Sequence, residues 1–193
     1  MKTGLTKHEL IRKITLVGIL TALATVLSFI KIPIVSSITI TLVLPVVVIG
    51  AALCGPIVGA WLTVIPAIAA LPEAALFMVY SPVGTLVTLF LKGILAGFTA
   101  GVIYKLLSKK HPIGAVAVSA VAAPVVNTGI FFLGCFIFLY DALVAMAQEA
   151  GVGMGTLILG LGVINFIIEL ILNVILCPVI LRIIQIATKN KFA

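Results

Sequence analysis

Between Lys31 and Glu73 the chain contains no charged residue, and this stretch limits the fold more than any other feature. It is long enough for two membrane-spanning helices, since each takes about 20 residues. Across the whole chain, hydrophobic residues make up 63% and charged residues 9%. A soluble domain needs about 25% charged residues to cover its surface. The sequence therefore predicts an all-α membrane protein with lipid as its solvent.

Turn signals and charges divide the chain into six apolar segments. The turn Cys54-Gly55-Pro56 splits the uncharged stretch into two spans, which we expect Pro45 and Pro66 to kink. We predict a bundle of six transmembrane helices in a single integral membrane domain over residues 1–193. The predicted spans are about 14–30, 38–53, 57–71, 83–107, 113–140 and 154–184, with an acidic, glycine-rich loop over residues 141–153.

Lysine and arginine residues cluster in three places, which share one side of the membrane if the chain has six spans. The clusters are Lys2, Lys7, Arg12 and Lys13; Lys105, Lys109 and Lys110; and Arg182, Lys189 and Lys191. The opposite side carries three acidic residues and only Lys31. Cytoplasmic loops are enriched in Lys and Arg, so both termini are predicted to be cytoplasmic. This topology accounts for the net charge of +7, and no nucleic-acid partner is predicted.

Two charged residues, Lys92 and Glu169, lie deep inside apolar segments. A charge in hydrocarbon is costly unless it faces a cavity or a partner, so each of them indicates a functional site. Polar residues at helical spacing accompany them: Thr88 with Lys92, and Asn165 and Asn173 on either side of Glu169.

At a rise of about 1.5 Å per residue, Lys92 and Asn165 both lie roughly 15 Å below the same surface. Asn127 falls at a comparable depth, so helix packing can gather these side chains around one cavity. The predicted substrate-binding residues are Lys92, Asn127, Asn165, Glu169, Thr88 and Asn173. A structural interpretation stays open, because Lys92 and Glu169 can pair to hold helices together and asparagines can bond neighbouring helices.

Small residues form two ridges that allow close helix contact. Gly93, Gly97 and Gly101 share a face of the fourth predicted span, which indicates internal packing. Gly18 and Ala22 share a face of the first predicted span, and this edge helix can offer its ridge to another protein.

Several kinds of chemistry have no sequence support. The chain has no GxxxxGK[ST] phosphate loop, so it cannot use ATP itself. Its histidines, His8 and His111, lie away from the intramembrane polar residues, and its three cysteines lack metal-site spacing. We therefore predict no enzyme, no metal site and no bound cofactor.

Six predicted spans in 193 residues, with both ends inside and no ATPase, resemble the substrate-binding S components of energy-coupling factor (ECF) vitamin transporters. The resemblance covers nearly the whole chain. The local patterns that carry it are Gly18-Ile-Leu-Thr-Ala22, Lys92-Gly93-Ile-Leu-Ala-Gly97 and Asn127-Thr128-Gly129, the last being most similar to the pantothenate-type branch. In that family an AxxxA motif on the first helix docks the transmembrane coupling subunit; here Gly18 replaces the first alanine.

The resemblance implies a multi-pass protein of a prokaryotic plasma membrane that captures a vitamin from outside in an intramembrane cavity. A transmembrane coupling subunit and two cytoplasmic ATPase subunits would complete the importer and use the ATP. Lys92 suits a carboxylate or phosphate and the asparagines suit hydroxyl or amide groups, which favours pantothenate. If Glu169 neutralises Lys92, a pyridoxine-like or thiamine-related ligand fits equally well.

Two other functions remain open at this point. One is a small secondary transporter that acts alone, with Lys92 or Glu169 carrying the coupling proton. The other is a structural membrane protein without a ligand.

Overall fold

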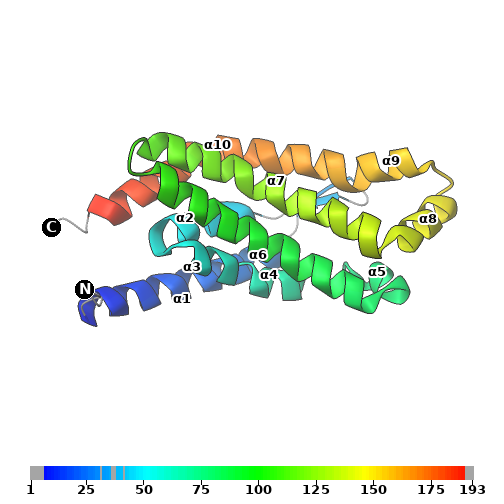
Figure 1. The fold of residues 1–193 in the computed structure, drawn as a ribbon, viewed down its shortest axis with the longest axis horizontal. Helices are drawn as coiled ribbons and strands as arrows, with labels where there is room; N and C mark the ends of the chain where they lie inside the picture. The colour runs from blue at the N-terminus through cyan, green and yellow to red at the C-terminus, as the bar shows by residue number, and fades with distance from the viewer. Residues whose placement is uncertain (1–6, 31, 36–37, 41, 190–193) are drawn as a thin grey trace.

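The computed structural model describes residues 7–30, 32–35, 38–40 and 42–189. Within these residues, four helices are long and apolar enough to cross a membrane: α1 (Lys7–Phe29), α6 (Pro82–Leu107), α7 (Pro112–Phe138) and most of α10 (Ile164–Lys189). Figure 1 shows α6, α7 and α10 running along the long axis, with α6 packed on α7 and α7 on α10. The prediction of an all-α membrane protein is confirmed as a class, whereas the count of six spanning helices is not.

The second and third predicted spans are shorter and more broken than expected. Residues 38–40 form strand β2, which pairs with β1 (Ile32–Val35), and helix α2 begins only at Val43 and ends at Cys54. The prediction of helix from residue 38 is therefore wrong, since the β-branched run there favours a strand. The next segment is divided into α3 (Pro56–Trp61) and α4 (Val64–Ala69).

The predicted kink at Pro45 is wrong, whereas the span that contains Pro66 is broken at Leu62 and Thr63, about one turn before the proline. Each proline is the third residue of its helix, Pro45 in α2 and Pro66 in α4. The first backbone N–H groups of a helix have no partner within it, so a proline there breaks no hydrogen bond. Both prolines stand at helix starts.

The predicted loop over residues 141–153 is mostly a helix, α8 (Tyr140–Glu149). Its buried residues Ala142, Leu143 and Ala147 give it an apolar side, which the nearby glycines and acidic residues obscure in the sequence. The last predicted span consists of α9 (Met154–Ile158), a π-helical turn η1 (Leu159–Val163) and α10. Another short helix, α5 (Ala75–Tyr80), precedes α6.

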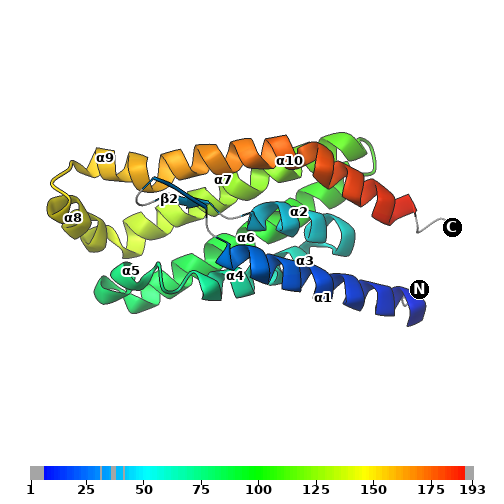
Figure 2. The ribbon, with the colours of Figure 1, turned by 180° about the vertical axis from the view of Figure 1, so that it is seen from behind.

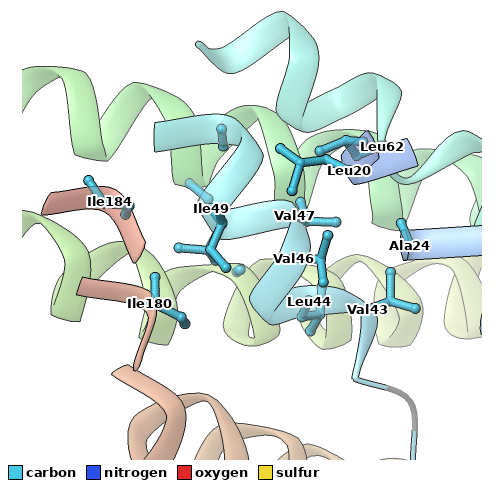
Figure 3. Packing of buried hydrophobic residues seen from close by; sticks show 14 of the residues in the cluster. Leu20, Ala24, Val43, Leu44, Val46, Val47, Ile49, Leu62, Ile180 and Ile184 are labelled. Carbon is cyan, nitrogen blue, oxygen red and sulfur yellow. The ribbon is translucent and has the colours of Figure 1, made fainter. Parts of the chain in front are cut away.

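Helix α2 lies at the centre of the core. Every residue from Val43 to Ala51 is buried, and Figure 2 shows α2 between α1 and α10. In the close view of Figure 3, Ile180 and Ile184 of α10 approach α2 from one side, and Leu20 and Ala24 of α1 from the other. Because α2 is apolar all round, it is suited to this buried position.

The small-residue ridge on α6 packs inside the protein, as predicted. A side chain on Gly97 would collide with the backbone of Gly59 in α3, and one on Gly101 would collide with Pro56. These glycines bring the backbones of α3 and α6 into contact. This contact fixes α6, which carries Lys92.

Both termini lie at one end of the bundle, together with the turn between α6 and α7 (Figure 1). This end holds Lys7, Arg12, Lys109 and Arg182. The opposite end holds α5 and α8, with Asp141 and Glu149 on α8. The bundle therefore has a basic end and an acidic end.

Candidate functional site

A cavity of about 210 Å³ lies among the helices, and α1, α2, α4, α6, α7 and α10 all contribute to its wall. We call it the polar compartment. Its polar lining residues are Ser28, Thr63, Glu73, Lys92, Asn127, Asn165 and Glu169. Four residues that the sequence singles out on three different helices thus meet at one cavity.

A second cavity of about 160 Å³ adjoins the first, and we call it the apolar compartment. Phe77, Phe131 and Leu139 form much of its wall, with Thr85 and Thr88 among its polar residues. Lys92 and Glu73 line both compartments. Lys92 therefore stands at the junction of a polar and an apolar space.

The Lys92 ammonium lies 5.0 Å from the centroid of the Phe131 ring, within the range of a cation–π interaction. Glu169 attracts Lys92 electrostatically, and Glu73 does so more weakly. Among the residues that the structure describes, no carboxylate oxygen lies within 4.0 Å of the ammonium. Lys92 is thus a cation that is partly stabilised by an aromatic face and not closed into an ion pair.

Two buried oxygen atoms on α10 belong to the polar compartment. Oε2 of Glu169 and Oδ1 of Asn165 have no hydrogen-bond partner within the described part of the chain. The Glu169 side chain is only 8% exposed. A buried acceptor without a donor costs about 1–3 kcal/mol, so both atoms are suited to accept hydrogen bonds from a bound molecule.

The remaining predicted residues lie elsewhere. Thr88 lines the apolar compartment, and its Oγ1 is buried without a partner among the described residues. It packs against Gly134 of α7, where a side chain would collide with it. Asn173 lines neither compartment; it is 2% exposed, and its Nδ2 donates to the backbone oxygen of Glu169 at 2.9 Å. Its Oδ1 is buried without a partner among the described residues, and the side chain lies outside the predicted binding cavity.

Several residues that line the two compartments were not predicted, among them Phe131, Ser28 and Thr63. Phe131 follows Asn127 by four positions, so the shared helix face was a usable signal for it. Ser28 and Thr63 carried weaker signals, because their hydroxyl groups donate to the backbone oxygens of Thr25 and Ala60, each at 2.7 Å. Such bonds within a helix are common for serine and threonine in apolar segments.

The predicted docking ridge on α1 faces outward. Gly18 and Ala22 are exposed, and a Cβ on Gly18 would have no heavy atom of the described residues within 4 Å, apart from its chain neighbours and the nearby backbone of its own helix. The ridge on α1 differs in this respect from the one on α6, which is covered by α3.

The arrangement is suited to binding. Within the described residues, no group of three or more His, Cys, Asp or Glu side chains is placed to hold a metal ion. The polar compartment instead offers the cation Lys92, the carboxylates of Glu73 and Glu169 and several amide and hydroxyl groups, which together can recognise a small polar molecule.

A protein-family model described as "ECF transporter, substrate-specific component" matches residues 12–181 of the chain. No curated protein and no solved structure matches it significantly.

Proposed function

Since the chain belongs to the family of ECF transporter substrate-specific components, we propose that it captures a vitamin in the polar compartment for import by an ECF transporter. Members of this family are substrate-binding subunits of transporters and not enzymes. The apolar helices and the family together make the chain a multi-pass membrane protein.

The observation that carries the proposal is the position of Lys92. It is a cation within an apolar helix, it faces a cavity, and no described carboxylate oxygen lies within 4.0 Å of its ammonium. Such a group is costly to keep in a membrane protein unless a ligand or partner uses it. A carboxylate or phosphate of the substrate would complete its interactions.

Pantothenate is the vitamin that we propose. Its carboxylate would face Lys92, and its amide and hydroxyl groups would face Asn127 and Asn165. These residues lie on α6, α7 and α10, so the ligand would join three helices.

We further propose that a transmembrane coupling subunit docks on the Gly18–Ala22 ridge and that two ATPase subunits supply the energy. The chain itself would bind no cofactor. With the basic end of the bundle in the cytoplasm, as the distribution of Lys and Arg favours, the compartments would open towards the outside of a prokaryotic plasma membrane.

Native mass spectrometry of the gently purified protein tests the binding role, with titration of pantothenate, pyridoxine and thiamine by calorimetry. A bound mass equal to that of pantothenate, absent in Lys92→Ala, is the expected result. If the chain alone takes up a vitamin into proteoliposomes under a proton gradient, it is instead a secondary transporter.

A further inference from the structure

We infer that the substrate carries at least two N–H or O–H donors placed apart from its anionic group, and that Asn165 and Glu169 recognise these donors. The inference rests on the proposed function, because it specifies the ligand of the same compartment. It adds a second requirement to the anionic group that Lys92 selects.

Three buried side-chain oxygens on α10 lack a donor among the described residues, and two of them, on Asn165 and Glu169, belong to residues that line the polar compartment. Oδ1 of Asn165 and an ionised Glu169 carboxylate can only accept hydrogen bonds. The residues are four positions apart, so their side chains lie on one helix face about 5–6 Å apart at Cβ. Both line the polar compartment, and Asn165 Oδ1 and Glu169 Oε2 lack donors in the described chain. Two neighbouring residues with unpartnered acceptors therefore line the same space.

The described residues do not supply the missing donors. Lys92 is the cation in the wall, but its ammonium lies over Phe131 and makes no ion pair with Glu169 within 4.0 Å. The side-chain amide of Asn173 on the same helix donates to a backbone oxygen. The acceptors are thus left for donors that come from within the cavity.

The charges in the polar compartment restrict the ligand further. The polar compartment holds Lys92 together with Glu169 and Glu73, so it is not a simple anion site. A ligand with an anionic group alone would leave two acceptors without donors and would bring its charge near Glu169. A buried group that loses its hydrogen-bond partner opposes binding. A ligand with an anionic group for Lys92 and hydroxyl or amine donors for Asn165 and Glu169 is therefore favoured.

A panel of small molecules tests the inference, with thermal stabilisation of the purified full chain in lipid nanodiscs as the readout. Pantothenate combines a carboxylate with two hydroxyl donors, whereas N-pivaloyl-β-alanine keeps the carboxylate but lacks both hydroxyls. Nicotinate is an anion without donors. Pantothenol and pyridoxine have donors but no anionic group. We expect pantothenate, which has both the carboxylate and the donors, to stabilise the protein most.

If N-pivaloyl-β-alanine or nicotinate stabilises the protein as well as pantothenate does, or if pantothenol or pyridoxine does so, the inference is wrong while the binding function stands. If nothing in the panel binds, the proposed function fails together with it.

A ligand-by-variant comparison then assigns the donor recognition. For the wild-type protein, Kd for N-pivaloyl-β-alanine, which lacks both hydroxyls, should be roughly 10- to 100-fold higher than Kd for pantothenate. Asn165→Leu removes an acceptor and keeps a similar volume. For this variant the two Kd values should differ by less than about threefold. Ser119→Ala is the matched control, because its Oγ is equally buried and unpartnered but lines neither compartment. If Asn165→Leu and Ser119→Ala give the same ligand ratio as the wild type, Asn165 does not recognise the donors.

Discussion

The Lys92 ammonium lies 5.0 Å from the centre of the Phe131 ring, and this contact joins α6 to α7 where the two compartments meet. An aromatic face stabilises a cation without neutralising it. The charge of Lys92 therefore remains available to an anion that enters the cavity. If Lys92 were paired directly with Glu169, much less of its charge would be available to an anion.

Lys92→Met should abolish most of the affinity for an anionic vitamin while leaving the fold intact. Methionine keeps the length of the side chain and removes its charge. Loss of a charged contact corresponds to a rise of Kd by roughly 10- to 100-fold. Stability should hold or increase, since a buried charge is removed from the membrane interior. Calorimetry and thermal unfolding of the two proteins measure both effects.

The matched control is Lys105→Met, on the exposed last turn of α6. It should change neither Kd nor the unfolding temperature. If Lys92→Met unfolds at a much lower temperature and retains its ligand affinity, Lys92 is a structural residue that holds helices together.

Phe131→Leu should weaken binding more modestly, roughly 2- to 30-fold, as expected for a lost cation–π contact. Leucine preserves an apolar wall but no longer holds the Lys92 ammonium at the junction. The Lys92 side chain is then more mobile in the free protein, and its ordering on ligand binding costs more entropy. Phe131→Tyr keeps the ring and should bind like the wild type. Equal Kd values for the leucine and tyrosine variants would show that the ring serves only as a wall.

Gly97→Ala should destabilise the protein, although glycine-to-alanine changes usually stabilise a helix by about 0.5–1 kcal/mol. A Cβ there would collide with the backbone of Gly59, and such overpacking costs typically about 1–3 kcal/mol. Gly18 has open space around it, so Gly18→Ala should leave the stability of the protein unchanged or increase it, as is usual for this change in a helix. Thermal unfolding, followed by the fluorescence of the single tryptophan, Trp61, compares the two variants. A more stable Gly97→Ala would mean that α3 and α6 are not in contact.

The polar wall of the site could be predicted because charged and amide side chains are conspicuous in apolar segments. Lys92, Glu169, Asn127 and Asn165 were visible in this way, and helix periodicity was enough to estimate their depth. Phe131 was missed: it shares a helix face with Asn127, but an aromatic residue that lines a cavity and one that faces lipid look alike in a sequence. Distinguishing them requires knowing which helix faces meet.

The long helices were easier to predict than the segments between them. The bounds of α6 and α7 follow from proline at each start and from polar or aromatic residues near each end. The region of residues 32–69 was harder, because it is apolar throughout and hydrophobicity alone does not separate a strand from a short buried helix. The structure shows that α2 is a short core helix, buried from Val43 to Ala51 and packed between α1 and α10 (Figure 2).

Gly18→Leu and Ala22→Leu should separate vitamin binding from vitamin transport. Both residues lie on the exposed ridge of α1 and neither lines the polar or the apolar compartment, so Kd for the vitamin should not change. If the coupling subunit docks on this ridge, a bulky side chain would hold the helices apart, because close contact requires small residues. Uptake by cells that express the complete transporter should then fall to background.

Gly18→Ala is the decisive control for this prediction. It restores an AxxxA pattern and adds a single methyl group, so both binding and uptake should match the wild type. Copurification of the partner subunits with each variant separates a docking defect from a later failure in transport. If Gly18→Leu binds the vitamin, retains its partners and transports normally, the coupling subunit must dock elsewhere. The exposed ridge on α1 would then face only lipid, whose chains tolerate leucine as readily as glycine.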